Sequence, residues 1–195
     1  MPRRYRSTIR KRRQEELCQR IVEATVFLHA EKGIAETTYK DIAQKADVAI
    51  PSVYKYFPDL SRLLTACTKH AAALAPVQSE EALTACPTLK KRVAALVDMR
   101  CQGHAYFHPW LKWGGERVMP EIRSLLEEDA RRTERLTIIA LSPAYVAKRI
   151  PKEIMGLVLV LLSYHTWASL RFDRGCTQQE AVNWLARAIC KLGEG

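Results

Sequence analysis

Long apolar runs are missing from this 195-residue sequence. The most apolar segment, residues 154–170, is interrupted by polar residues from Ser163 onward and is shorter than the roughly 20 residues that a membrane-spanning helix needs. The basic N-terminus reaches Glu15 and Glu16 before any apolar stretch of signal-peptide length can begin. We therefore expect a cytoplasmic protein without a membrane partner.

Cysteine is also sparse. The six cysteines stand at positions 18, 67, 86, 101, 176 and 190, and this irregular spacing excludes a disulfide-stabilised scaffold. Such thiols are typical of reduced, mostly buried side chains in a reducing compartment. With 48% hydrophobic and 27% charged residues, the composition is that of a globular protein and excludes a disordered chain.

Sequence motifs of common enzyme classes are absent. The chain has no glycine-rich phosphate loop, no nucleophile elbow and no pair of carboxylates beside a matching base. Gly114 and Gly115 stand together, but they lack the further glycines or the lysine of a phosphate-binding motif. We therefore expect neither an enzyme nor a bound cofactor.

Acidic residues are outnumbered, since 31 lysines and arginines face 21 aspartates and glutamates and give a net charge of +10. Residues 3–13 alone contain seven basic residues and no acidic one. A polyanionic partner is the natural inference from this run. The alternative is a solvated tail that only confers solubility.

Helical periodicity runs through almost the whole sequence, and no stretch of two-residue alternation indicates a strand. The fold class is therefore predicted to be all-α. Caps, prolines and apolar stripes predict helices over about residues 13–31, 38–46, 50–57, 60–75, 88–107, 120–142, 152–172 and 177–192.

Two of the short predicted helices have the geometry of a helix-turn-helix. Thr38 can cap the first, Pro51 stands in the first turn of the second, and only residues 47–49 separate them. The DNA major groove admits one α-helix, so side chains not needed for packing can reach base edges and phosphates. The second helix offers Pro51, Ser52, Tyr54, Lys55 and Tyr56. The alternative is an ordinary three-helix packing unit with tyrosines on its surface.

Residues 33–64, GIAETTYKDIAQKADVAIPSVYKYFPDLSRLL, resemble the DNA-binding signature of the TetR family of bacterial transcription regulators. The shared features are a threonine pair before the first short helix, the Ile42–Ala43 pair, a turn ending at Val48, the Val-Tyr-x-x-Phe pattern and the two leucines that follow. Beyond the first helices, the chain resembles the family only in helix count and length.

This resemblance implies a homodimer that binds a palindromic operator and a small ligand. The resemblance implies a helix-turn-helix domain over 13–59 and a ligand-binding and dimerisation domain over 60–195, and the run of basic residues adds a basic arm over 1–12. By residue match, phosphate contacts would come from Thr38, Tyr54 and Tyr56, and contacts to bases or nearby phosphates from Tyr39, Lys40, Pro51, Ser52 and Lys55.

Two positions depart from the family pattern. Ala49 stands where the family often has a capping serine, and Leu60 stands where it often has a phosphate-binding lysine. These departures weaken the cap of the second short helix and put one anchoring contact in doubt. The basic arm is a candidate source of replacement charge, with the adjacent minor groove as a place for it.

The two C-terminal helical segments, 153–172 and 177–192, are apolar on more than one face. One small subunit cannot bury all of that surface, so we expect a dimer interface built as a four-helix bundle with two helices from each partner. In the alternative, Trp184 and its neighbours only close the core of the monomer.

Large side chains with a few polar tips suit a ligand pocket between helices. The candidates are Met99, Tyr106, Trp110, Trp113, His165 and Trp167, although such residues at helical spacing are also typical of an ordinary core. Arg100, Lys112 and Arg117 would favour an anionic ligand if they pointed inward, but exposed solvation is the expectation for them.

We expect a small, largely apolar ligand to release the protein, as a repressor, from its operator. The change would pass along the helix that begins near residue 60, through the packing of Leu63, Leu64 and Cys67. A ligand can do this only if it binds the non-operator conformation more tightly.

Two other hypotheses stay open. Cys101, His104 and His108 fall at i, i+3 and i+7, a spacing that suits zinc or copper in a metal-responsive regulator, although Pro109 follows directly. A helical protein-interaction adaptor would use the same helices. Salt-dependent binding to duplex DNA distinguishes the regulator from the adaptor.

Overall fold

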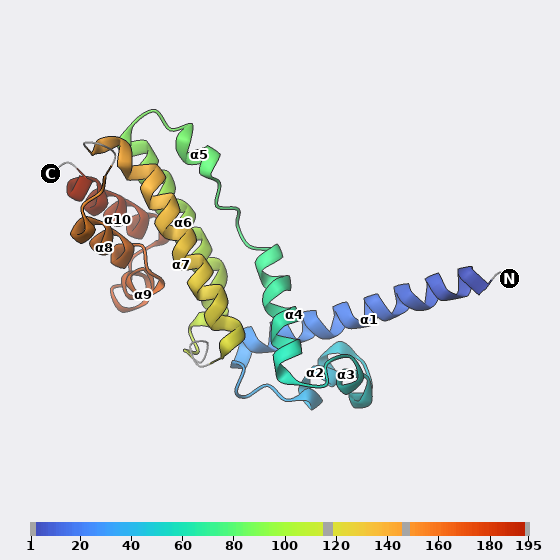
Figure 1. The fold of residues 1–195 in the computed structure, drawn as a ribbon. Coiled ribbons are helices and arrows are strands. Elements are labelled where there is room, and N and C mark those ends of the chain that lie inside the picture. The colour runs from blue at the N-terminus through green and yellow to red at the C-terminus, as the bar shows by residue number, and fades with distance from the viewer. Residues whose placement is uncertain (1–2, 115–118, 146–148, 194–195) are drawn as a thin grey trace. The chain divides into compact units, whose positions relative to one another are not determined.

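The protein is all-α, as predicted. A computed structural model describes residues 3–114, 119–145 and 149–193, and these segments contain α-helices, short 3-10 and π-helical turns and no strand (Figure 1). The chain divides into two compact units. The first comprises residues up to 74 together with 109–124, and the second comprises 75–108 together with 125–195.

The first unit is built on the long helix α1, Arg3–Lys32, followed by α2, Tyr39–Ala46, α3, Ile50–Tyr56, and α4, Leu60–Ala73. Ile21, Thr25 and Leu28 recur at helical spacing on α1 and are buried. The core that they share with α2, α3 and α4 contains Ile42, Ala43, Ala46, Val53, Phe57, Leu63 and Cys67. This core holds the two short helices against α1.

Helix α1 begins about ten residues earlier than the predicted start near residue 13, so the boundary drawn after the basic run was wrong. Arginine and lysine are good helix formers, and the run contains no proline or glycine that would stop a helix. Two i,i+4 ion pairs, Lys11 with Glu15 and Arg12 with Glu16, support this part of the helix. The basic arm is therefore helical.

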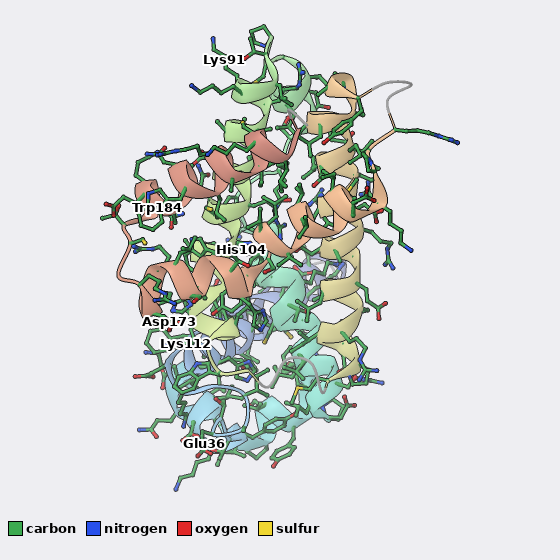
Figure 2. All side chains as sticks on the ribbon, turned by 90° about the vertical axis from the view of Figure 1, so that its left-hand side faces the viewer. Glu36, Lys91, His104, Lys112, Asp173 and Trp184 are labelled. Carbon is green, nitrogen blue, oxygen red and sulfur yellow. The ribbon has the colours of Figure 1, made fainter. Side chains whose placement is uncertain are left out.

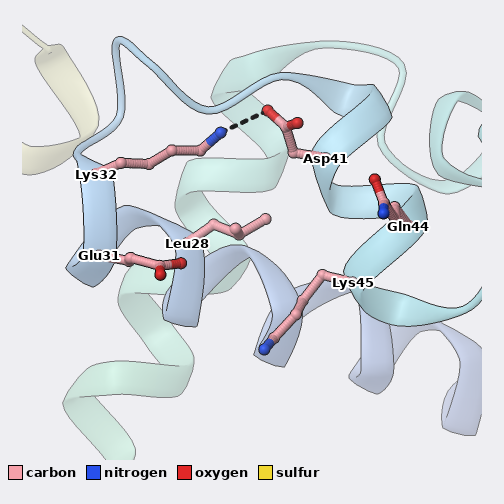
Figure 3. Close-up of a pocket in the computed structure, with 6 residues that line it drawn as sticks. All are labelled: Leu28, Glu31, Lys32, Asp41, Gln44 and Lys45. Atoms are coloured by element: carbon pink, nitrogen blue, oxygen red, sulfur yellow. Dashed lines mark hydrogen bonds and ion pairs between the residues drawn. The ribbon is translucent and has the colours of Figure 1, made fainter.

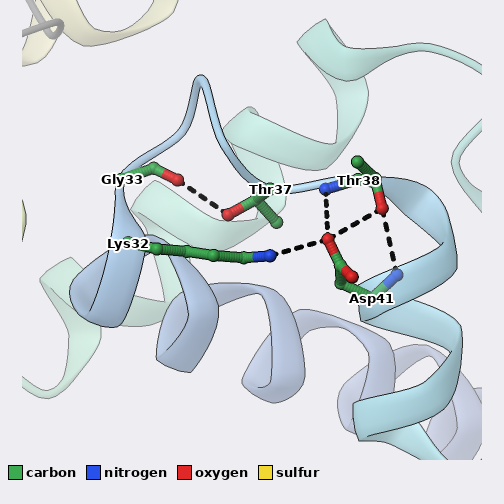
Figure 4. A network of polar contacts seen from close by, with 5 residues as sticks. All are labelled: Lys32, Gly33, Thr37, Thr38 and Asp41. Carbon is green, nitrogen blue, oxygen red and sulfur yellow. Dashed lines mark hydrogen bonds and ion pairs between the residues drawn. The ribbon is translucent and has the colours of Figure 1, made fainter.

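Helix α2 begins with the predicted cap (Figure 4). The Thr38 hydroxyl accepts a hydrogen bond from the Asp41 amide at 3.2 Å, and the Asp41 carboxylate accepts from the Thr38 amide at 3.0 Å. The same carboxylate receives the Lys32 ammonium from the end of α1 at 2.7 Å. These contacts, with Lys32 first, hold the pKa of Asp41 well below its usual value.

The second unit contains α5, Glu80–Thr84, α6, Leu89–Leu111, α7, Pro120–Leu141, α8, Lys152–Leu161, α9, Tyr164–Ala168, and α10, Gln178–Gly193. The last residues of α6 and the first residues of α7 belong to the first unit. The core of the second unit draws on all six helices and includes Leu83, Leu96, Leu136, Val158, Trp167, Leu185 and Ile189. Thr177 caps α10 as predicted, because its hydroxyl accepts from the Glu180 amide at 3.2 Å.

The predicted single helix over 152–172 is wrong. The helix stops at Leu162, because Ser163 takes an extended conformation and its hydroxyl accepts from the Thr166 amide at 3.3 Å. Thr166 donates its own hydroxyl to the Val160 carbonyl at 2.7 Å, so side chains compete here with the helical backbone bonds. A π-helical turn over Ser169–Asp173 follows α9.

Two smaller differences concern α5 and α6. Helix α5 was not predicted, although Ser79 caps it and Leu83 is fully buried. Helix α6 continues past its predicted end at 107, through Pro109 to Leu111. The indole nitrogen of Trp110 donates to the Val26 carbonyl of α1 at 2.9 Å and holds this last turn.

The described helices include none that could cross a membrane by itself. Helix α8 and the following segment Tyr164–Asp173 pass that test of length and composition only as a pair, which is bent by 45°. Both halves contribute to the core of the second unit, through Val158, Leu162 and Trp167.

Two buried histidines make stability depend on pH. Burial lowers the pKa of His29 and of His104 to about 4, with Arg100 adding to the effect at His104. In the unfolded chain each histidine binds a proton near pH 6.5, so unfolding takes up protons at mild acidity. We expect stability to be complete above pH 6.5 and to fall by on the order of 3 kcal/mol for each histidine by pH 4.

Denaturant unfolding between pH 4 and 7 measures this effect. A His104→Gln variant keeps a donor for the Leu162 carbonyl but does not titrate, so its stability curve should be flatter than that of the wild type. His165→Gln, at an exposed position, is the matched control. If stability falls with pH equally in the wild type and in the His104 variant, His104 is not a source of the pH dependence.

Candidate nucleic-acid interface

The turn between α2 and α3 is fixed by backbone contacts. Asp47 has the left-handed conformation with φ of 53°, and its amide donates to the Gln44 carbonyl at 3.3 Å. The Val48 amide donates to the Ala43 carbonyl at 3.0 Å, which closes the end of α2. The Asp47 carbonyl lies 3.4 Å from a guanidinium nitrogen of Arg20 on α1. The turn and α1 together therefore set the direction in which α3 leaves.

Helix α3 has one buried face and one exposed face. Val53 and Phe57 are buried in the core of the first unit, whereas Pro51, Tyr54 and Lys55 are exposed at i, i+3 and i+4. We call these three residues the exposed face of α3. This arrangement keeps the three side chains out of the core, which is what a helix that enters a groove requires.

Aromatic rings join the exposed face of α3 to the start of α2. The rings of Tyr39 and Tyr54 lie 4.7 Å apart. Burial, followed by the charge of Asp59 and the neighbouring Tyr54, raises the pKa of Tyr39, so its phenol stays protonated. Lys55 lies with its ammonium 5.3 Å from the ring centroid of Tyr56. The two helices thus present Tyr54, Lys40 and Lys55 on one surface, whereas the Tyr39 hydroxyl is buried and has no hydrogen-bond partner among the described residues.

The other predicted contact residues lie around this surface. Lys40 is exposed, and Ser52 and Tyr56 are half-buried. Thr38 is exposed, but its hydroxyl donates to Asp41 at 2.7 Å and its amide donates to the same carboxylate. Both hydrogen-bond donors of Thr38 are therefore engaged in the helix cap.

The two departures from the family pattern have visible consequences. Ala49 occupies the N-cap of α3 and makes no side-chain cap bond, so Pro51 alone favours the helical start. Leu60 is 42% exposed and can supply no charge. Asp59, just before it, caps α4 by accepting from the Arg62 amide at 2.8 Å.

A pair of tryptophans, missed by the sequence analysis as structural contacts, anchors the end of α1. Trp110 donates to the Val26 carbonyl, and Trp113 donates to the Ala30 carbonyl at 3.2 Å. Gly33, at a positive φ of 81°, ends α1 beneath the ring of Trp113. We call Trp110 and Trp113 the tryptophan clamp. The pattern of a glycine after a helix predicted the end of α1 but not its partner.

The candidate ligand residues are divided between the two units. Trp110 and Trp113 belong to the first unit, whereas Trp167 is buried in the core of the second and donates to Gln178 at 3.0 Å. Met99 is half-buried against that core, Tyr106 is half-buried beside Phe107, and His165 is exposed. Of the three candidate cations, Arg100 is buried, Lys112 is exposed and Arg117 lies outside the described residues.

The metal hypothesis gains no support from the geometry. The described residues contain no group of three or more histidine, cysteine, aspartate or glutamate side chains placed to hold a metal ion. His104 contacts the Leu162 carbonyl at 2.8 Å through Nε2, and His108 contacts the Tyr164 hydroxyl at 2.9 Å. Burial raises the pKa of Cys101 to about 12, which disfavours the thiolate that a metal needs.

Two open hollows lie on the surface of the first unit. The larger, about 620 Å³, is lined by Leu28, Glu31, Lys32, Asp41, Gln44 and Lys45 (Figure 3). The smaller, about 310 Å³, lies beside Phe27, whose ring carries the Lys45 ammonium at 3.6 Å. Neither hollow contains a residue predicted to bind ligand or DNA. Their mixed charges fit a solvated surface.

The comparisons with known proteins agree with this geometry. Residues 21–67 match the model of the bacterial regulatory proteins of the tetR family, which spans the end of α1 and helices α2 to α4. Among curated proteins, no relative of significant sequence similarity is found.

Solved structures share the fold over most of the chain. One is a TetR-family transcriptional regulator from Rhodococcus sp., 16% identical, with a TM-score of 0.64 over 91% of this chain and 99% of that one. Another is a transcriptional regulator of the TerR/AcrR family from Aquifex aeolicus VF5, 14% identical, with a TM-score of 0.59 over 90% and 99%. A third is the multidrug binding protein EbrR complexed with imidazole, 19% identical, with a TM-score of 0.55 over 89% and 88%.

At these identities the solved structures show a common fold, and the family model identifies the DNA-binding unit within it. Residues 21–67 are therefore a DNA-binding unit of the tetR family of bacterial regulatory proteins, and the chain as a whole shares the fold of TetR-family regulators.

Proposed function

We propose that this regulator is a repressor that binds a palindromic operator as a homodimer and is released by a small, largely apolar ligand. The observation that carries the proposal is the exposed face of α3, which follows a fixed turn and lies outside the core of the first unit. Pro51, Tyr54 and Lys55 would reach base edges and nearby phosphates in the major groove. Tyr39, Lys40, Ser52 and Tyr56 would hold the flanking backbone.

The helical basic arm adds a second source of affinity. An α-helix with its side chains is about 10–12 Å across, whereas the minor groove of B-DNA is about 6 Å wide. We therefore infer that the arm lies along the phosphates and does not enter the minor groove. Arg10 and Arg13 are exposed on the same side of the helix, whereas Lys11 and Arg12 are paired with acidic residues.

An unpartnered apolar face on α8 and α10 supports the homodimer. Leu157, Val160 and Trp184 are 52%, 62% and 48% exposed, and Figure 2 shows Trp184 pointing outward from α10. The two helices pack against each other within the second unit (Figure 1). Gly156, beside Leu157, leaves open space for the close approach of another helix. A second copy of the same face would complete a four-helix bundle.

Ligand release would depend on the packing of α4 and on the end of α6. Leu63, Leu64 and Cys67 are buried in the first unit, where the Cys67 thiol lies 3.9 Å from the Val22 carbonyl of α1. The tryptophan clamp is a second candidate for transmitting the ligand signal, because it lies at the end of α6, a helix that begins in the second unit. A ligand that shifts α6 would pull on α1, and operator binding must weaken ligand binding by the same factor.

The first test is DNA binding itself. Operator fragments selected from random duplexes by the purified protein should be palindromic, with half-sites one helical turn apart. Lys55→Met should weaken binding to the selected operator and lower its salt dependence by about two charges for each dimer, and Tyr54→Ala should weaken it without unfolding the chain. Lys69→Met, at an exposed position on α4, is the control. Unchanged affinity in both α3 variants would place the interface elsewhere.

The arm is tested by charge removal that preserves the helix. Replacing Arg3, Arg4, Arg6 and Arg10 by glutamine should lower the slope of log affinity against log salt by up to about 7, because a dimer with two such arms displaces up to eight fewer counterions. Glutamine keeps nearly the helix propensity of arginine. The same change at the exposed residues Lys90, Lys91, Arg131 and Arg187 is the control. If the slope of log affinity against log salt is equal in the two variants, the arm does not contact DNA and only confers solubility.

The dimer is tested by a charge on the apolar face. Trp184→Asp and Val160→Asp should give monomers with weak operator binding, because a buried unpaired carboxylate is costly at a packed interface. Ile138→Asp changes an equally exposed apolar residue on α7 and should leave the dimer intact. Sedimentation equilibrium measures the outcome. If the Trp184 and Val160 variants remain dimeric, the dimer interface lies on another face of the protein.

A further inference from the structure

A charged side chain lies at the centre of the apolar face of α6. Arg100 is only 5% exposed, and it falls between the fully buried Leu96 and Val97 on one side and the buried His104 on the other. All four residues lie on the face that packs into the core of the second unit. A buried guanidinium costs free energy unless it is paired, and a leucine would fill this position without that cost.

One edge of the guanidinium is paired. The Arg100 Nη1 and Nη2 groups donate to the two carboxylate oxygens of Asp129 on α7, each at 2.9 Å. The Asp129 side chain is 46% exposed, so this pair reaches the surface at its acidic end. Arginine carries five donors, and its second edge consists of Nε and the adjacent nitrogen.

The second edge of Arg100 lacks an acceptor. Its Nε is buried and has no hydrogen-bond partner among the described residues. The Oε1 atom of Gln78, which also belongs to the second unit, is likewise buried and has no hydrogen-bond partner among the described residues. Two unsatisfied groups of opposite kind in one unit indicate that a further polar group belongs there.

The Gln78 amide occupies the place beside Gly103 on α6. Its Nε2 atom lies 3.4 Å from the position that a Gly103 Cβ would take. Gly103 follows Arg100 by three residues, so the two positions are neighbours one helical turn apart. Gln78 lies in the irregular segment before α5, where a side chain can swing outward without breaking a helix. A carboxylate has nearly the shape of the carboxamide that it would replace.

We propose that Arg100 is the anchor for the carboxylate of an amphipathic ligand, whose head group takes the place of the Gln78 amide. The inference rests on the proposed ligand-responsive function and names the chemical class of the ligand. The head group would accept from the free edge of Arg100, while Asp129 keeps the other edge. The apolar body would pack against core residues such as Leu96, Leu162 and Trp167. The displaced Gln78 amide would be satisfied by water.

The experiment measures binding to the full chain with three probes of equal length. They are octanoate, 1-octanol and octylammonium, titrated at pH 7.5 by calorimetry in the absence of DNA. We expect octanoate to bind at least about ten-fold more tightly than 1-octanol, because only its carboxylate can accept a charged hydrogen bond from Arg100, and octylammonium to bind most weakly, because its charge repels the guanidinium. Equal binding of octanoate and octanol, or no binding of octanoate, would overturn the proposal.

Variants assign the preference to Arg100. Arg100→Gln should bring octanoate and octanol to equal affinity, whereas Lys112→Gln, which removes an exposed cation near the end of the same helix, should leave the preference intact. Asp129→Asn keeps the guanidinium and removes a competing negative charge, so it should tighten octanoate several-fold and leave octanol unchanged. An octanoate preference that survives in Arg100→Gln would overturn the anchor.

A second readout covers the case in which Arg100→Gln fails to fold. Weaker or unchanged octanoate binding in Asp129→Asn then overturns the proposal by itself, because an ion pair that only joins α6 to α7 gives no gain in carboxylate affinity. Operator binding without octanoate is measured on the same samples. A wild type that binds operator but shows no carboxylate preference contradicts the anchor alone, whereas a wild type that binds no duplex contradicts the proposed function.

Discussion

The arrangement of the DNA-binding unit depends on the carboxylate of Asp41. It receives the Lys32 ammonium from the last turn of α1 and two donors of Thr38 from the start of α2. One side chain therefore fixes where α2 begins and how it stands against α1. Helix α3 follows after three residues and has no side-chain cap of its own, so it inherits its direction from this contact and from the burial of Val53 and Phe57.

The second unit combines a well-packed apolar core with polar side chains inside it. Thr137 is fully buried and donates to the Thr133 carbonyl, and His104 is held neutral against the Leu162 carbonyl. These groups satisfy their hydrogen bonds within the core, as buried polar groups normally do. Arg100 differs, because a charge stays buried with one edge unsatisfied among the described residues. Packing alone accounts for the first two residues and not for the third.

Features that depend on a few neighbouring residues could be predicted from the sequence. The cap at Thr38, the turn at residues 47–49 and the exposed face of α3 follow from local spacing and were correct. The start of α1 was missed because a run of arginines suggests a tail, although the same residues favour a helix. The helix predicted over 152–172 failed because Ser163 formed a local bond that apolar periodicity does not reveal.

The proposed ligand residues show where sequence patterns stop being informative. A tryptophan on an amphipathic helix fills a core, lines a pocket or donates its indole hydrogen to another helix, and the choice depends on which helix packs against it. Trp167 fills the core of the second unit and also donates to Gln178 of α10, whereas Trp110 and Trp113 donate to backbone carbonyls of α1. Likewise, composition predicts an exposed arginine, and only the packing of α6 against α7 explains the burial of Arg100.

Gly33 gives the first unit a site where response and recognition can be tuned separately. Any side chain there would face a positive φ and would meet the Trp113 ring, whose nearest atom lies 3.1 Å from the added Cβ. The change would loosen the grip of the tryptophan clamp without touching a single residue of the exposed face of α3. Under the proposed ligand-responsive function, we expect a chain altered at this glycine to keep its operator preference and to respond at a different ligand concentration, so that sensitivity could diverge while the promoter stays the same.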